Sequence, residues 1–404
     1  MNQLQPLEQR PPDVIIPPFP SWPRFDEEEI AAVTAVLRSG RVNRWTGQEN
    51  ELFEQEFATF TGCRHAIAVA NGTVALELAL LALGIGPGDE VIVSSRTFIA
   101  SASAVVVRGA TPVVADIDPD SQNLSAVTVQ PLLTPRTRAI IAVHLAGWPC
   151  DMDPLLELAR AHNIKVIEDC AQAQGASYRG RPVGSLGDVA AFSFCQDKIM
   201  TTGGEGGMLT TNDTEIWQKA WAYKDHGKDY NTVFCGESGA AFRWLHHSFG
   251  TNWRMTEMQA AIGRIMLRKL PSWLAIRRRH AAILTDTFQN IHGLRVTIPS
   301  AEIAHAYYKY YTFVEESDLP AVVTRDGLIT AINAAGIPCF SGSCSEIYRE
   351  KAFIAAGLSP PERLPVARRL GETSLMFLVH PTLTEDHIIQ TGKVVEAIMT
   401  PGTY

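Results

Sequence analysis

The sequence predicts an α/β fold in which a mostly parallel sheet lies between layers of helices. Short apolar, β-branched runs alternate with amphipathic segments through the first half of the chain. Near-continuous apolar strands separated by helices are typical of a parallel sheet that is covered on both faces. The seven expected strands are residues 65–70, 90–95, 111–117, 138–145, 165–170, 189–194 and 207–211.

Helix signals lie between and around these strands. A segment at 26–37 starts with acidic residues and ends before Ser39-Gly40, as helices commonly do. A later segment begins at a Thr256 cap and is expected to end at Leu270, because Pro271 interrupts the backbone hydrogen bonds of a helix. Further helices are expected at 49–60, 74–83, 100–108, 152–162 and 217–223.

Two domains are expected from the 404-residue length. The large domain takes residues 1–274 and begins with an arm at 11–25 that is rich in proline and aromatic residues. The small C-terminal domain takes residues 275–404 and is α+β, with strands at 307–315 and 337–340 and a helix at 322–335. The arm is apolar, so we expect it to pack on the body of the protein or on a neighbouring subunit.

Composition and charge exclude several classes of protein. The net charge of −8 disfavours nucleic-acid binding, which needs a basic face, and no apolar run is long enough for a membrane span. The start of the chain does not resemble a signal peptide, and seven scattered cysteines without a CxxC pair favour a reduced, cytoplasmic protein. No metal site is expected, since the adjacent pair His246-His247 cannot place both rings on one helical face.

Chemically useful residues follow the ends of several predicted strands. In parallel sheets, ligands bind at the C-terminal edge. This edge would gather Asn71-Gly72-Thr73, residues 95–98, Asp169 to Gln172 and Ser193 to Lys198. The Asn71-Gly72-Thr73 turn precedes a helix, which suits either an anion-binding helix terminus or a simple N-cap by Thr73.

These residue types match the demands of pyridoxal phosphate (PLP). A phosphate suits the N–H groups of Gly72 and Thr73 with the Ser193 hydroxyl, and an aromatic ring suits stacking on Phe98. A protonated pyridine nitrogen needs a carboxylate, and an aldehyde needs a lysine. Asp169 ends a predicted strand, and Lys198 follows another and precedes a pliable glycine-rich bend.

The chain resembles the DegT/DnrJ/StrS family of PLP-dependent sugar aminotransferases, which have fold type I, the aspartate-aminotransferase fold. The resemblance covers nearly the whole chain. It is carried by Ala70-Asn-Gly-Thr73, Glu168-Asp-Cys-Ala-Gln-Ala-Gln-Gly175, the segment 192–207 and Asn252-Trp-Arg-Met255. Departures from the family pattern are Cys170, Gln174, Cys195 and the extra glycine of Gly203-Gly204. We expect Cys170 and Cys195 to be core thiols.

The resemblance implies residue roles. Lys198 matches the lysine that holds PLP as a Schiff base, Asp169 the carboxylate on the pyridine nitrogen, and Gln172 the partner of the phenolic oxygen. Phe98 matches the stacking aromatic, and Gly72, Thr73 and Ser193 match the phosphate site. Asn252 is similar to a residue that a partner subunit lends to the phosphate, which implies a homodimer with a shared active site. His305 is similar to a histidine on the substrate side.

The implied reaction moves an amino group from glutamate or glutamine to a keto sugar, expected to be one linked to a nucleotide, in amino-sugar biosynthesis. An alternative acceptor is a keto-cyclitol or another non-nucleotide ring, because relatives of similar sequence use such compounds. A sugar dehydratase is disfavoured, since such members of the family have histidine where Lys198 stands. A PLP-binding regulator is disfavoured too, because it would need an added DNA-binding module.

Overall fold

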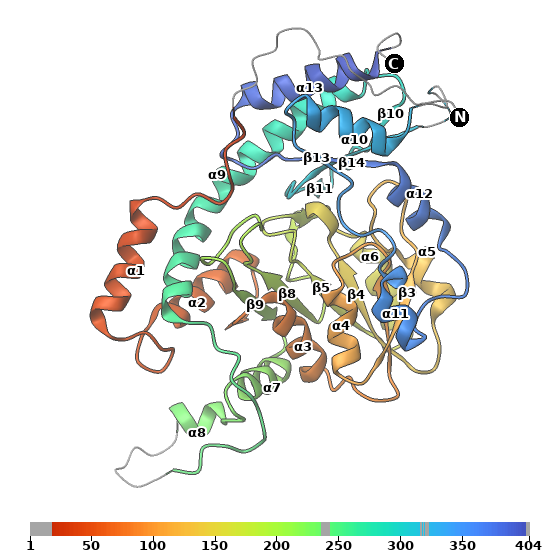
Figure 1. The fold of residues 1–404 in the computed structure, drawn as a ribbon. Helices are drawn as coiled ribbons and strands as arrows, with labels where there is room; N and C mark the ends of the chain where they lie inside the picture. The colour runs from red at the N-terminus through yellow and green to blue at the C-terminus, as the bar shows by residue number, and fades with distance from the viewer. Residues whose placement is uncertain (1–17, 236–242, 316, 318, 320–322, 401–404) are drawn as a thin grey trace.

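The computed structural model describes residues 18–235, 243–315, 317, 319 and 323–400. A central sheet surrounded by helices forms the lower body in Figure 1, and a smaller unit containing the C-terminus lies above it. The long helix α9 (Glu257–Phe288) runs from one to the other. The α/β prediction is therefore confirmed.

The central sheet has seven strands in the order β1-β9-β8-β5-β4-β2-β3. The run from β8 to β3 is parallel, and β9 is antiparallel to both β8 and β1. All seven predicted strands are present, and the sheet is mostly parallel as expected. Their bounds are β1 His65–Val69, β2 Glu90–Ser94, β3 Thr111–Ala115, β4 Thr137–Val143, β5 Lys165–Asp169, β8 Val189–Ser193 and β9 Gly207–Thr211.

Helices cover both faces of this sheet, and the strand side chains alternate between them. Val91 and Val93 of β2 pack in a core with a first group of helices, whereas Ile92 packs in another core with two helices of a second group, α5 (Ala126–Val129) and α6 (Met152–Ala161). This alternation is expected for a strand with period two. The first group is α3 (Gly72–Ala82), α4 (Ala100–Val107) and α7 (Thr214–Lys224); the second is α2 (Glu49–Thr61), α5, α6 and α9.

Helix α3 begins two residues earlier than the sequence suggested. Asn71, with extended backbone angles, is its N-cap, and its side chain accepts a hydrogen bond from the Val74 N–H at 3.0 Å. The alternative in which Thr73 caps the helix is therefore wrong, because Thr73 is already inside the first turn. Asparagine is as good an N-cap as threonine, and here it lies at the end of β1.

Helix α9 continues through Pro271, so the predicted end at Leu270 is wrong. The Ser272 hydroxyl donates to the Lys269 carbonyl at 2.7 Å beside the proline. Leu270, Leu274 and Arg277 are buried on either side of the interruption. Tertiary packing therefore outweighs the roughly 3 kcal/mol that an internal proline costs a helix. The Thr256 cap is confirmed, and it forms a capping box with Gln259.

The C-terminal unit is an antiparallel sheet in the order β10-β12-β14-β13, packed with the second half of α9 and with α10 and α13. Division of the chain at residue 274 stays a prediction, since α9 crosses that position. The elements of this unit are β10 Leu294–Val296, β12 Tyr310–Val314, β13 Cys339–Phe340, β14 Ser374–Phe377, α10 Arg325–Ala334, α12 Pro365–Thr373 and α13 Glu385–Met399. Helix α11 (Lys351–Ala356) packs instead in the core of the central body through Phe353. A three-stranded sheet joins β11 Ile303–Ala304 to β6 Ser177–Tyr178 and β7 Arg181–Pro182.

The described part of the N-terminal arm packs on the body, as predicted. The Phe19 ring meets His387 of α13 edge to face at 5.2 Å, and Trp22 meets Trp273 of α9 in the same way at 5.1 Å. Residues 11–17 of the predicted arm lie outside the described residues. Helix α1 (Glu27–Ser39) follows the arm. The short helix α8 (Tyr230–Phe234), much later in the chain, lies away from the central sheet (Figure 1). Among the described helices, none has the length and apolar character needed to cross a membrane.

Candidate active site

The C-terminal edge of the central sheet gathers several of the residues singled out from the sequence. β5 ends at Asp169 and the neighbouring β8 ends at Ser193, with the turn that carries Lys198 a few residues further on. Both strand ends are buried, and Lys198 is mostly covered. The parallel pairing of β5 with β8 is what places the two ends at one edge.

Asp169 is a buried carboxylate whose described interactions leave it short of positive charge. Its Oδ2 accepts a hydrogen bond from the Ser101 hydroxyl at 2.8 Å, and its Oδ1 accepts one from the Ala171 N–H at 3.1 Å. Burial raises the pKa of Asp169, and these hydrogen bonds and the charge of Lys198 offset that rise only in part. A cation bound against this carboxylate would stabilise its ionised form.

Gly72 and Ser193 lie in direct contact, which joins the start of α3 to the end of β8. A Cβ atom at residue 72 would stand 2.6 Å from the Ser193 Cβ, so only glycine fits. Thr73 follows Gly72 in the first turn of the helix, where backbone N–H groups have no helical partners. This turn and the Ser193 hydroxyl can together receive a phosphate.

Gln172 and Phe98 present groups that the described protein leaves available. The Gln172 Oε1 accepts a hydrogen bond from the Ala146 N–H at 2.8 Å, and this bond fixes the orientation of the amide. The NH₂ group therefore remains as a donor. Phe98, in the loop between β2 and α4, is 67% exposed, which is high for a phenylalanine. The nearby Ser101, two residues into α4, connects this loop to Asp169.

The glycine-rich bend after Lys198, which the sequence predicted to be pliable, has a defined path held by hydrogen bonds. The Phe194 N–H donates to the Gly206 carbonyl at 2.7 Å, and the Gln196 N–H donates to the Gly204 carbonyl at 3.0 Å. The Thr201 hydroxyl donates to the Phe194 carbonyl at 2.9 Å. Gly203 and Gly204 have positive φ angles of 90° and 123°, so the extra glycine shapes a defined turn.

Lys198 is surrounded by residues that the sequence alone did not single out. The Trp22 Nε1 donates to the Lys198 carbonyl at 2.7 Å. The Lys198 Nζ lies 5.1 Å from the centre of the Tyr308 ring and 3.8 Å from Asp197 Oδ1. The Tyr308 phenol donates to the other Asp197 oxygen. Burial favours the protonated form of Asp197, but Lys198, Tyr308 and Lys309 together keep its pKa below the usual value.

His305 is brought near this edge by its backbone, while its ring is packed away. The Ala306 N–H donates to the Gly147 carbonyl, which places the segment beside Ala146, the partner of Gln172. The His305 ring stacks on Tyr307 at 3.8 Å, and its Nδ1 accepts from the Tyr307 N–H. Burial, with Arg278 nearby, lowers the pKa of His305 to about 3, so the ring is neutral.

Asn252 stands apart from the other candidates in the described chain. It is exposed, and its Oδ1 accepts a hydrogen bond from the Arg254 N–H at 3.4 Å. The following residue, Trp253, accepts from the Ala70 N–H at the end of β1. No described contact joins the Asn252 side chain to Gly72, Ser193 or Lys198.

The cysteines are all free, and Cys195 is not the core thiol that was expected. Cys170 is fully buried, but Cys195 is partly exposed beside Ser193, and its N–H donates to the Ser193 hydroxyl at 3.4 Å. A buried group of His144, Glu168 and Cys170 has the spacing of metal ligands. However, His144 already bonds to Glu168 and to the Cys150 N–H, and Glu168 accepts three backbone N–H groups, so the protein itself uses these atoms.

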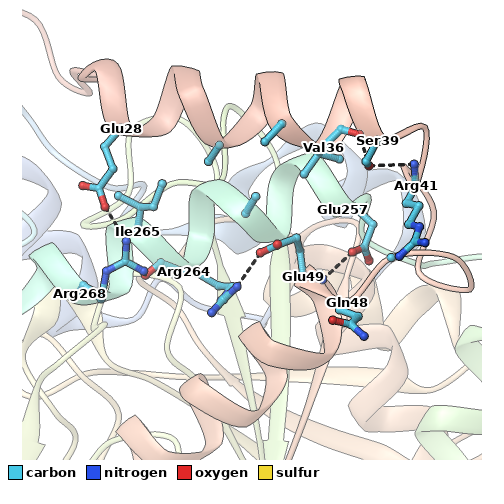
Figure 2. A pocket seen from close by; sticks show the side chains of 14 residues that line it. Glu28, Val36, Ser39, Arg41, Gln48, Glu49, Glu257, Arg264, Ile265 and Arg268 are labelled. Atoms are coloured by element: carbon cyan, nitrogen blue, oxygen red, sulfur yellow. Dashed lines mark hydrogen bonds and ion pairs between the residues drawn. The ribbon is translucent and has the colours of Figure 1, made fainter.

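A separate cavity of about 460 Å³ lies between α1, α2 and α9 (Figure 2). Its charged lining is largely paired within the protein: Arg264 bonds to Glu49 at 2.7 Å, and Arg268 bonds to Glu28 at 2.6 Å. The cavity contains none of the residues at the C-terminal edge of the sheet. It is therefore not the candidate active site.

Comparison with solved structures identifies the fold. An aminotransferase from Psychrobacter cryohalolentis superposes with a TM-score of 0.93 and is 55% identical, with 94% of this chain and 98% of that chain covered. This agreement confirms the prediction of the PLP-dependent aminotransferase fold, with its mostly parallel central sheet.

Curated relatives agree with the structural match. The GDP-perosamine synthase of Caulobacter vibrioides is 43% identical over 352 residues, which cover 86% of this chain and 89% of that protein. The 3-amino-5-hydroxybenzoate synthase of Amycolatopsis mediterranei is 35% identical, with 88% of this chain and 89% of that protein covered. A sequence model of the DegT/DnrJ/EryC1/StrS aminotransferase family matches residues 23–398. The chain thus belongs to this family and is an aminotransferase.

Proposed function

We propose that the protein is a PLP-dependent aminotransferase that moves an amino group from glutamate or glutamine to a nucleotide-linked keto sugar. The observation that carries the proposal is the convergence of Lys198, Asp169 and the Gly72–Ser193 contact at one edge of the sheet. Membership of an aminotransferase family supplies the reaction class.

The residues present fit PLP. The buried Asp169 carboxylate needs a cation, which the protonated pyridine nitrogen provides. The Gln172 NH₂ group is oriented to donate to the phenolic oxygen, and the exposed Phe98 ring offers a face for stacking. Gly72, Thr73 and Ser193 would hold the phosphate.

The chemistry of the bound group is that of an electron sink, which stabilises the carbanion formed when a proton leaves carbon. Lys198 would hold the cofactor through its amine, and the same amine, when free, would take the proton from the donor Cα as a general base. Asp169 would keep positive charge on the ring nitrogen. Trp22 and Asp197 hold the turn on which Lys198 sits.

The names of the relatives support two candidates for the compound that accepts the amino group. One relative is named for a GDP-linked amino sugar, which supports a nucleotide-linked keto sugar. Another is named for an aminobenzoate, which supports a keto-cyclitol or related ring as the second candidate. We place His305 on the substrate side because its segment lies beside Ala146 and Gln172.

We also propose that each active site is shared between the two subunits of a homodimer. Asn252 is exposed and makes no described contact with the phosphate residues of its own chain. An exposed asparagine in this position supports a homodimer in which each Asn252 reaches the phosphate of the other subunit.

A panel of nucleotide-linked 3-keto and 4-keto sugars and keto-cyclitols, incubated with the holoenzyme and glutamate or glutamine, tests the function. Mass spectrometry should detect an amino product from a nucleotide-linked sugar. Product from a keto-cyclitol alone would decide for the alternative. Lys198→Ala should abolish turnover and the visible absorption of the bound cofactor; retention of either would contradict the role of Lys198.

A further inference from the structure

Lys309 shares an aromatic ring with the proposed catalytic lysine. It lies immediately before β12, and its Nζ is 4.8 Å from the centre of the Tyr308 ring. The Nζ of Lys198 is 5.1 Å from the same centre. An ammonium group over a tyrosine face is attracted by the ring, so Tyr308 attracts both amines. Lys309 is therefore part of the surroundings of Lys198.

This region carries more positive than negative charge. Arg277 of α9 is buried, donates to the Tyr307 and Tyr308 carbonyls at 3.3 Å, and lies 5.3 Å from the centre of the Trp22 ring. The carboxylate beside these cations is Asp197, which already accepts from Tyr308 and lies close to Lys198. Among the described residues, Lys309 Nζ has neither an ion pair nor a hydrogen bond.

The local electrostatics reflect this imbalance. Burial lowers the pKa of Lys309 to about 8; the charge of Asp197 opposes the change, and those of Arg277 and Lys198 add to it. His380, which stacks on Trp22, has its pKa lowered to about 3 by burial and then by Arg277 and Lys309. A half-buried ammonium group without an ion pair of its own is costly, and a bound anion would reduce that cost.

We propose that Lys309 binds the α-carboxylate of the amino donor. Lys309 can have this role only if the chain performs the amino transfer proposed above. The donor's nitrogen takes the place of the Lys198 amine, and its α-carboxylate is two bonds away from that nitrogen. The diphosphate of a nucleotide sugar is separated from the reacting carbon by atoms of the sugar ring, so it lies further from the Lys198 amine than the carboxylate does.

The donor half-reaction tests this role without any sugar. The holoenzyme is mixed with L-glutamate or L-glutamine, and the loss of its visible cofactor absorption is followed at several concentrations. Lys309→Met should lower the second-order rate constant roughly 10- to 100-fold, as expected for a lost hydrogen bond to a charged group. Lys309→Arg should recover most of the rate. A primary amine that lacks the carboxylate should react equally with wild type and Lys309→Met.

Controls separate this role from a structural one and from the proposed function. Lys393→Met removes an exposed lysine of α13 and should leave the rates unchanged. The melting temperature and cofactor absorption of Lys309→Met should match those of wild type. Equal rates for wild type and Lys309→Met with glutamate and with glutamine would overturn only the role of Lys309 and would leave the proposed function standing. A raised KM for the keto sugar with an unchanged donor reaction would assign Lys309 to the sugar's diphosphate. That result would also overturn the proposal that Lys309 binds the donor's carboxylate. A wild-type protein that reacts with no amino acid would overturn the proposed function itself.

Discussion

The Trp22 indole donates a hydrogen bond to the main-chain carbonyl of Lys198 across 2.7 Å, although the two residues are 176 positions apart. Trp22 also meets Trp273 edge to face and lies beneath the Arg277 guanidinium. The N-terminal arm is thus part of the structure that positions the lysine. Because the bond is to the backbone, it acts on the turn and leaves the amine free.

Trp22→Phe should lower the free energy of unfolding by about 1 kcal/mol, since a typical intramolecular hydrogen bond contributes that much. We expect kcat to fall several-fold and the visible absorption of the cofactor to persist, because the Lys198 amine is untouched. Thermal unfolding and steady-state kinetics measure the two effects. Trp273→Phe keeps the hydrogen bond and is the matched control; an equal loss of kcat in both variants would contradict the specific role of the bond.

Gly72→Ala should weaken cofactor binding because the added methyl group has no room. Its carbon would lie 2.6 Å from the Ser193 Cβ and 3.0 Å from the Ser193 Cα. Overpacking of this kind costs roughly 1–3 kcal/mol, which should appear as a lower melting temperature and a weaker PLP affinity in equilibrium dialysis. Gly86→Ala is the control, since its nearest neighbour would be 3.9 Å away. Unchanged PLP affinity in Gly72→Ala would place the phosphate elsewhere.

Gln172→Glu should preserve the fold and weaken PLP binding. The carboxylate can still accept the Ala146 N–H, which Gln172 now does at 2.8 Å. It loses the NH₂ donor and turns a negative charge toward the phenolic oxygen. We expect roughly 10-fold weaker PLP binding, the equivalent of one lost hydrogen bond to a charged group. Absorption titration of the apoenzyme with PLP gives the affinity, and a value equal to wild type would remove Gln172 from the cofactor site.

Asp169→Asn should have opposite effects on the apoenzyme and the holoenzyme. Burial raises the folded-state pKa of Asp169, so the charged form is disfavoured in the apoprotein. The contribution of Asp169 to the free energy of unfolding is therefore lost as the pH rises through that pKa. The oxygen of a neutral asparagine can accept the Ala171 N–H, and its NH₂ group can donate to the Ser101 hydroxyl in place of the bond that Asp169 now accepts. Apo Asp169→Asn should therefore unfold at a higher temperature than the wild-type apoprotein at neutral pH. The holoenzyme should lose most of its turnover, because nothing holds the positive charge on the ring nitrogen. A less stable apoprotein would show that Asp169 already has a sufficient counter-charge.

Sequence patterns predicted the regular part of this molecule well. The seven strands were expected because they are near-continuous apolar runs separated by helices, and Lys198, Asp169 and Ser193 were expected to lie together because parallel strand ends meet at one edge. Two local rules were overridden. Pro271 did not end α9, since buried leucines on either side hold the helix, and Asn71 took the cap that was assigned to Thr73.

The surroundings of Lys198 were not predictable in the same way. Trp22, Asp197 and Tyr308 meet there only because the arm and the segment before β12 fold back onto the turn. No spacing in the sequence encodes such long-range contacts. One signal was available in principle: Tyr308-Lys309 lies just after His305, in a stretch that was already considered for its histidine.

The pH dependence of donor use follows from Lys309. Its folded-state pKa of about 8 is lowered from the usual 10.5 by burial and by Arg277 and Lys198, against the attraction of Asp197; Tyr308 is the other group in contact. Only protonated Lys309 attracts a carboxylate. Because kcat/KM reports the free enzyme, kcat/KM for glutamate should fall as the pH rises through about 8, and by up to about 10-fold per unit above it. Lys309→Arg stays charged throughout this range, so its profile should lack the fall. Any decline common to both proteins belongs to other groups, such as the cofactor-bound Lys198. Two superimposable profiles would show that the charge of Lys309 does not bind the donor.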